Sequence, residues 1–130
     1  MVSLIFVLLA GVCWGILQTL MWHPDTNILS KKNPKWWNPN ISYKNKYNKI
    51  DGVIPPYPPK FFGSTTFLAW TTDGWHLVDK IFLTCIFLSI VLYKPWINIP
   101  LDFIIYYLVF TITFELVWRK LKVLTKLLML

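Results

Sequence analysis

The sequence predicts an all-α membrane protein with three transmembrane helices, a short interfacial or re-entrant helix and an amphipathic C-terminal helix, folded as a single membrane domain. Hydrophobic residues make up 55% of the 130 residues and charged residues only 15%, whereas soluble domains carry about 25% charged residues. Three apolar runs are long enough to cross a membrane, and the basic residues gather beside them. This composition excludes a disordered chain, and two cysteines are too few for a disulfide scaffold.

The first span covers residues 3–22, a stretch without a single charge. A helix of this length matches the hydrocarbon core of a bilayer, which is roughly 30 Å thick. We expect an uncleaved anchor, because the run has neither a basic leading segment nor a small-residue cleavage site. Within it, Gly11 and Gly15 form a G-x-x-x-G pattern with Gln18 on the same face. This pattern predicts a close helix contact, either within the chain or between copies, across which Gln18 could donate a hydrogen bond.

Residues 23–63 form an aromatic and basic segment, which we predict to be a cytoplasmic loop. The segment holds seven of the 13 Lys and Arg, and tryptophans and tyrosines are interleaved with them. Aromatic rings suit the headgroup boundary of a membrane, where lysines reach the lipid phosphates. A docking surface for another protein explains the composition equally well. The candidate residues for lipid or partner docking, two of them from the C-terminal tail, are Trp36, Trp37, Lys44, Lys46, Arg119 and Lys122.

The second span is expected over residues 77–93, after an interrupted stretch. Hydroxyl residues at 64–66 suit the start of a short interfacial or re-entrant helix. Gly74 is the expected break because glycine has the lowest helix propensity in that stretch.

The third span is expected over residues 101–118, after a short connection that contains two prolines. A connection this short joins antiparallel neighbours. In the tail, residues 119–130, the spacing of Arg119, Lys122 and Lys126 predicts an amphipathic helix that lies on the membrane surface.

The distribution of charge predicts the orientation in the membrane. Three spans put the 23–63 segment and the C-terminus on one side, which then holds nearly all the lysines and arginines. Because cytoplasmic loops carry an excess of positive charge, we expect the N-terminus outside and the C-terminus in the cytoplasm, in a bacterial inner membrane. The flanking of apolar runs by these charges favours membrane lipids as partners and argues against nucleic acid.

Ionisable residues are expected to converge near the cytoplasmic boundary. Asp73, His76 and Asp79 stand before or at the start of the second span, and Glu115 stands near the end of the third. Carboxylates and imidazole are ligands for Mn, Fe or Zn, and an acid with a base could act on lipid headgroups. The candidate metal ligands are therefore Asp73, His76, Asp79 and Glu115, and the candidate catalytic residues are Asp73, His76 and Glu115. The sequence requires no cofactor.

A structural role for the same residues is the favoured alternative. Charges stand at helix ends because water is there, and Glu115 could form a buried pair with His76 or Lys80. Glu115 also stands one turn before Arg119, a spacing that permits an ion pair. An ionisable group inside a membrane is costly and usually partnered, so Glu115 is a candidate site residue by default.

Several short motifs in the middle of the chain resemble those of small, uncharacterised integral membrane proteins of Bacteroidetes-type bacteria. The motifs are Trp37-Asn38-Pro39, Lys44-Asn45-Lys46-Tyr47, Gly63-Ser64-Thr65-Thr66 and Thr72-Asp73-Gly74-Trp75-His76-Leu77. The resemblance implies a bacterial inner-membrane location and no particular activity.

Three classes of function follow from these observations. The first is assembly, as an oligomer of the chain itself or as an accessory subunit of a complex with other membrane proteins. The second is a small membrane enzyme or metal-binding protein that uses the boundary cluster. The third is an oligomeric channel or transporter, because three spans need several copies to enclose a pathway.

Overall fold

The computed structural model describes residues 2–48 and 57–127, and every named element within these ranges is helical. The three long helices are α1 (Val2–Trp22), α5 (Gly74–Val91) and α6 (Ile99–Leu127). Each is long and apolar enough to cross a membrane, which confirms the all-α class with three candidate spans. The short elements are α2 (Ile28–Lys32), α3 (Pro34–Trp37), α4 (Pro39–Ser42) and the 3-10 turns η1 (Tyr43–Lys46) and η2 (Ala69–Thr71).

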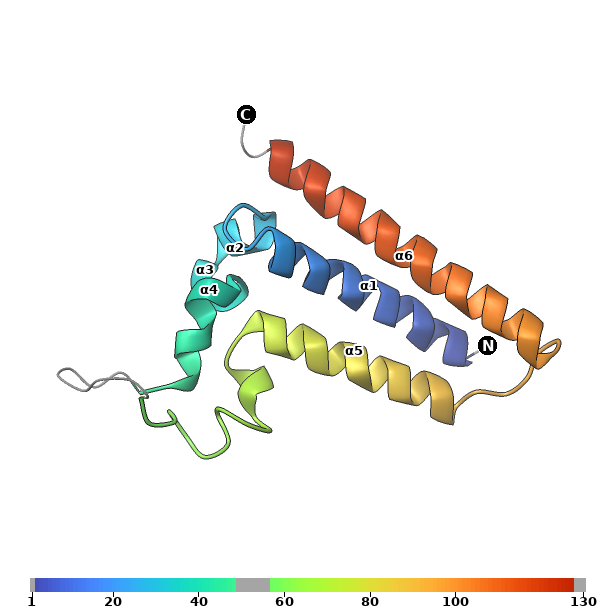
Figure 1. Cartoon of the computed structure of the whole chain (residues 1–130), viewed down its shortest axis with the longest axis horizontal. Helices are drawn as coiled ribbons and strands as arrows, with labels where there is room; N and C mark the ends of the chain where they lie inside the picture. Colours follow the sequence, from blue (N-terminus) through green and yellow to red (C-terminus); the bar gives the residue numbers. More distant parts are fainter. Residues whose placement is uncertain (1, 49–56, 128–130) are drawn as a thin grey trace.

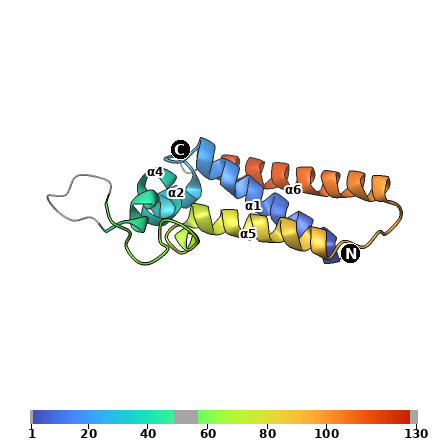
Figure 2. The ribbon, with the colours of Figure 1, turned by 60° about the horizontal axis from the view of Figure 1, so that its bottom comes forward.

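Helix α1 lies between α5 and α6 and packs along both of them (Figures 1 and 2). It runs parallel to α6 and antiparallel to α5. On the α5 side, Cys13 and Leu17 form a buried cluster with Val78, and the rings of Trp14 and Phe82 lie 5.3 Å apart. The first helix is therefore the centre of the bundle, and α5 and α6 are separated by it.

Two helix ends differ from the predicted boundaries by more than two residues. The stretch before Gly74 holds only the 3-10 turn η2, and the extended backbone of Asp73 (φ −158°) starts α5 three residues earlier than expected. The tail is not a separate surface helix within the described residues, because α6 continues to Leu127. No glycine or proline interrupts the chain after Trp118, so nothing ends the helix there. At 1.5 Å per residue, α6 is about 43 Å long and exceeds the hydrocarbon thickness.

The segment between α1 and α5 folds into a small platform, which we define as residues 23–48 and 57–73. Asn27 and Asn38 cap α2 and α4 by accepting a hydrogen bond from a backbone N–H in the first turn of each helix. The two arms of the platform meet at Tyr47 and Pro59, which form an isolated antiparallel bridge. Residues 49–56, which include part of the proline run, lie outside the described residues. The predicted loop is thus partly helical and rests against the end of the bundle.

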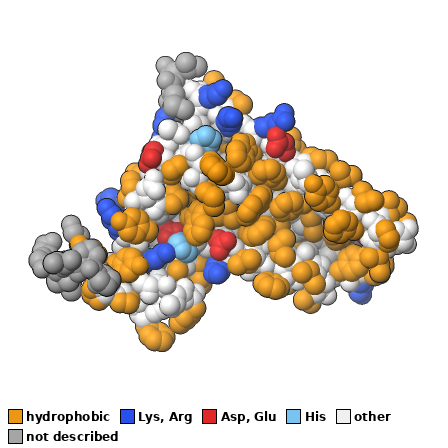
Figure 3. All heavy atoms as spheres, viewed as in Figure 1, with side chains coloured by type: hydrophobic (Ala, Val, Ile, Leu, Met, Phe, Trp, Pro, Cys, Tyr) orange, Lys and Arg blue, Asp and Glu red, His pale blue; other side chains and the backbone are white. Residues whose placement is uncertain are grey.

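The outer faces of the long helices are covered by hydrophobic side chains (Figure 3). Lys and Arg gather mainly around the end that carries the platform and the C-terminal part of α6. Helix α6 has the fewest buried residues of the three spans. An apolar belt with charges at its ends is typical of a membrane protein.

Candidate functional site

Asp73 and His76 form a closed pair at the N-terminus of α5. Asp73 is the N-cap residue, and its Oδ1 accepts a hydrogen bond from the His76 backbone N–H at 2.9 Å. The His76 Nδ1 lies 2.8 and 2.9 Å from the two carboxylate oxygens of Asp73. Because the Asp73 side chain is only 1% exposed, the carboxylate holds the imidazole ring in one orientation, with a proton on Nδ1.

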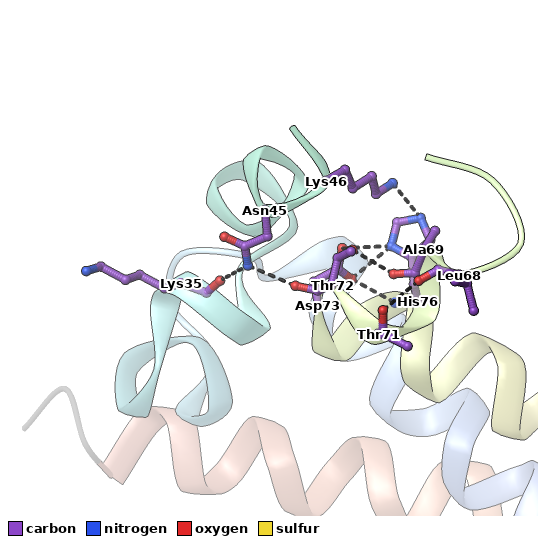
Figure 4. A network of polar contacts seen from close by, with 9 residues as sticks. All are labelled: Lys35, Asn45, Lys46, Leu68, Ala69, Thr71, Thr72, Asp73 and His76. Carbon is purple, nitrogen blue, oxygen red and sulfur yellow. Dashed lines mark hydrogen bonds and ion pairs between the residues drawn. The ribbon is translucent and has the colours of Figure 1, made fainter. Parts of the chain in front are cut away.

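Lys46 connects the platform to this pair (Figure 4). Its Nζ lies 2.8 Å from His76 Nε2. Since Nδ1 donates to Asp73, Nε2 is an acceptor and the ammonium group donates to it. Asn45 adds a second connection, because its Nδ2 donates to the Thr72 carbonyl at 2.9 Å and to the Lys35 carbonyl at 2.7 Å. Both ring nitrogens of His76 are therefore occupied within the chain.

Trp37 packs directly on the first residue of α5. A Cβ atom at Gly74 would lie 2.6 Å from Trp37 Cζ3 and 2.8 Å from its Cδ2, so this position has room for glycine only. The indole also packs against the Cys13, Leu17 and Val78 cluster. Trp37, a candidate docking residue, thus joins the platform to the bundle.

Glu115 lies apart from this network. The Arg119 Nε donates to Glu115 Oε1 at 2.7 Å, which confirms the ion pair expected from the one-turn spacing. The expected buried pair of Glu115 with His76 or Lys80 is wrong, because α1 separates α6 from α5. The Glu115 side chain is 46% exposed and that of Arg119 is 75% exposed, so the pair points away from the bundle.

The four candidate metal ligands do not form one site. Within residues 2–48 and 57–127, no group of three or more His, Cys, Asp and Glu side chains could hold a metal ion. Asp73 and His76 come together, Asp79 is half-buried further along α5, and Glu115 belongs to α6. The three catalytic candidates are divided in the same way: Asp73 and His76 lie together at the start of α5, and Glu115 lies apart from them on α6.

The two glycines of the first span face α6. A Cβ at Gly11 would lie 2.8 Å from the Phe110 carbonyl oxygen, and a Cβ at Gly15 would lie 2.8 Å from Val117 Cβ and Cγ1. The absence of side chains lets the two backbones approach closely. Gln18 forms a contact within its own helix instead of the expected one across helices: its Oε1 accepts a hydrogen bond from Trp22 Nε1 at 2.8 Å.

The other candidate docking residues lie on the surface at the platform end. Trp36 is half-buried, and Lys44 is exposed with its Nζ 5.8 Å from the centroid of the Tyr43 ring. Arg119 and Lys122 are exposed on α6. Trp36, Lys44 and Lys122 leave a basic and aromatic rim around the end of the bundle, and Arg119 lies three residues before Lys122, farther from that end.

Asp102, at the opposite end of the bundle, is a polar site that the sequence analysis missed. Its carboxylate is 1% exposed and accepts hydrogen bonds from the backbone N–H of Trp96 at 2.7 Å, that of Ile97 at 3.2 Å and the Tyr93 hydroxyl at 3.0 Å. Burial and the bond to Asp102 raise the pKa of Tyr93. The sequence contains one signal for this site, an acid four residues after Asn98. The Asn98 side chain accepts a hydrogen bond from the Leu101 backbone N–H in the first turn of α6.

Comparison with known proteins adds no assignment. No family model, no curated protein and no solved structure matches the chain. The resemblance to Bacteroidetes-type membrane proteins therefore stays a prediction, and the function has to be argued from the geometry.

Proposed function

We propose that the protein acts by assembly in the membrane, as an oligomer in which α6 of one copy packs against α6 of another. The observation that supports this proposal is the position of the Glu115–Arg119 ion pair. The pair lies on the outer face of α6, at a depth where a bilayer offers neither water nor a counter-charge.

The depth follows from the contacts between α1 and α6. Gly11 faces Phe110 and Thr113, and Gly15 faces Phe114 and Val117. Glu115 is therefore level with the part of α1 between the two glycines. This part is the middle of α1 (Val2–Trp22), whose length of about 31 Å matches the hydrocarbon core.

An exposed ion pair at this depth is costly in lipid. A single Glu or Arg near the centre of a membrane helix costs about 2.5–3.5 kcal/mol on insertion scales, and such residues almost always face protein or a water-filled cavity. Arg119, one turn nearer the basic end, can reach toward the headgroups, but the shorter Glu115 side chain cannot follow it.

A second copy of the chain supplies the missing polar surroundings. Copies insert in the same direction, so a two-fold axis along the membrane normal places two α6 helices side by side in parallel. Glu115 of each copy then lies one turn from Arg119 of the other, and the two pairs can join into a four-charge network. Exposed Leu108, Ile112 and Leu116 on α6 would form the apolar part of the contact.

Disulfide cross-linking in membranes tests this arrangement. In a chain whose Cys13 and Cys85 are replaced by Ala, Leu116→Cys should give a disulfide-linked dimer under mild oxidation. Phe87→Cys, at an equally exposed position on α5, is the matched control and should stay monomeric. The charge variant Glu115→Gln, Arg119→Gln should abolish the Leu116→Cys cross-link while the helical content stays unchanged.

The cross-linking results distinguish an oligomer of this chain from an accessory subunit of another complex. A cross-link from Leu116→Cys to a protein of different mass would favour the accessory-subunit form of assembly. Equal cross-linking at residues 87 and 116, or a monomer in lipid nanodiscs at every concentration, would refute assembly through α6.

The proposal includes an orientation, with the platform in the cytoplasm of a bacterium. The excess of Lys and Arg at the platform end supports this orientation. Two exposed lysines offer a matched test in the same cysteine-free chain. Lys94→Cys, in the connection between α5 and α6, should react with an impermeant maleimide on intact cells, and Lys44→Cys should react only after lysis. The reverse pattern would invert the orientation.

The Asp73–His76 pair favours a second candidate, a small membrane enzyme with an acid–base residue at the boundary. An imidazole oriented by a buried carboxylate is the arrangement of a general base. Here Lys46 occupies the nitrogen that a substrate would need, so the pair supports catalysis only if Lys46 moves away. Lys46→Ala, which frees His76 Nε2, should therefore show more hydrolase activity on phospholipids than the parent protein, and His76→Ala should show none. Equal activity in all three proteins would refute this candidate.

A further inference from the structure

A pocket of about 100 Å³ lies where the end of α1, the turn that follows it and the last turns of α6 meet. The turn contributes His23 and Thr26, and α6 contributes Trp118, Lys122 and Lys126. The pocket is on the face of α1 that packs against α6 and is therefore separate from the network around His76.

The wall formed by the turn is held in place by a buried side chain. Asn27 is 0% exposed, and its Nδ2 donates to the His23 carbonyl at 2.6 Å and to Ser30 Oγ at 2.9 Å. Its Oδ1 accepts from the Ser30 N–H at 2.9 Å. These bonds fix the turn, so His23 and Thr26 are positioned beside α6 before any ligand arrives.

Two buried threonines form the inner part of the pocket and offer no free hydrogen-bond donor. The Thr19 hydroxyl donates to the Gly15 carbonyl, and the Thr125 hydroxyl donates to the Leu121 carbonyl, each at 2.8 Å. Together with the Trp118 ring and the lysine stems, these side chains make a wall that is mostly carbon. A small inorganic anion would gain little from such a wall, whereas the glycerol and upper acyl carbons of a lipid would pack against it.

The rim of the pocket is cationic. Lys122 and Lys126 are one turn apart on the same face of α6, a spacing at which like charges repel. Within the described part of the chain, neither lysine has a carboxylate within ion-pair distance. An anion between the two ammonium groups would remove the repulsion, and Thr26 and His23 provide further polar groups on the opposite wall.

We infer that this pocket binds the phosphate group of one anionic phospholipid, with the lysines and the turn around the phosphate and the lipid carbons against Trp118 and the threonines. The depth is appropriate, because the pocket is at the end of α1 where the headgroups of the platform-side leaflet lie. Basic pockets between membrane helices on that side are suited to anionic headgroups. The inference depends on the spans and not on assembly through α6.

Lipid titration followed by native mass spectrometry tests the inference. The full chain in detergent should bind one phosphatidylglycerol, and Lys122→Gln, Lys126→Gln should raise the Kd about 30-fold, since each lysine near an anionic lipid contributes a factor of about five. The matched control is Lys60→Gln, Lys120→Gln, which removes the same charge from exposed positions outside the pocket and should leave the Kd unchanged. All four lysines are exposed, and the melting temperature of each variant provides the check on folding.

Two further arms identify the source of the phosphate. Phosphatidylcholine should bind more weakly than phosphatidylglycerol, and millimolar inorganic phosphate should leave the bound lipid in place. Displacement by inorganic phosphate would overturn the lipid assignment. An equal loss of affinity in both double variants, or equal binding of the two lipids, would overturn the pocket as a phosphate site.

Discussion

Adding one methyl group at Gly15 tests the close contact between α1 and α6. The new Cβ would lie 2.8 Å from two carbons of Val117 and 3.1 Å from the Phe114 carbonyl oxygen, all closer than van der Waals contact. Overpacking of this kind costs about 1–3 kcal/mol. The replacement of glycine by alanine inside a helix returns about 1 kcal/mol, so Gly15→Ala should destabilise the bundle by up to about 2 kcal/mol.

The two glycines should differ in whether a second change can rescue them. At Gly15 the nearest obstacle is a side chain, so Gly15→Ala combined with Val117→Gly should recover part of the lost stability. At Gly11 the nearest obstacle is the Phe110 carbonyl oxygen, at 2.8 Å. Backbone cannot be removed by mutation, so Gly11→Ala with Thr113→Gly should show no comparable recovery.

Unfolding in mixed micelles with increasing denaturing detergent gives the free energies for this comparison. A rise in stability for Gly15→Ala alone would mean that helix propensity outweighs the contact and would refute the argument. The position would then have room for a side chain, and the close approach of the helices would be incidental.

Three further predictions use the same unfolding assay. His76→Ala and Lys46→Gln should each destabilise the protein, and the double variant should cost less than their sum because they share one hydrogen bond; strict additivity would contradict the contact. His76→Ala and Glu115→Gln should be additive within about 0.5 kcal/mol, since α1 separates them; a larger coupling energy would contradict the order of the helices. Asp102→Asn should destabilise the protein, because the amide replaces an ionised acceptor of three hydrogen bonds. An unchanged stability would show that the carboxylate is not needed.

The three candidate spans could be predicted because hydropathy and length are local properties of the sequence. The ion pair of Glu115 with Arg119 could be predicted for the same reason, since helical spacing alone brings them together. The continuation of α6 beyond Trp118 does not follow from the sequence pattern, because basic residues after an apolar run are also typical of a new surface helix. Charge does not end a helix, and no glycine or proline was present to do so.

The network around His76 shows which information a sequence pattern lacks. Its partner Lys46 is 30 positions away and belongs to a segment without regular periodicity, so no spacing rule connects the two. Glu115 was placed with His76 because both were expected at a similar depth. Depth does not specify which side of the bundle a residue occupies, and the position of α1 between α5 and α6 decided that question.

The central position of α1 has a consequence for the order in which the bundle can be completed. Helix α1 ends at Trp22 and its parallel partner α6 begins at Ile99. The face of α1 that carries Gly11 and Gly15 therefore has no partner until α6 is synthesised. A nascent chain that has inserted only α1 and α5 carries Gly11 and Gly15 uncovered in the lipid. During that interval another small-residue helix could occupy the groove, and the arrival of α6 closes it.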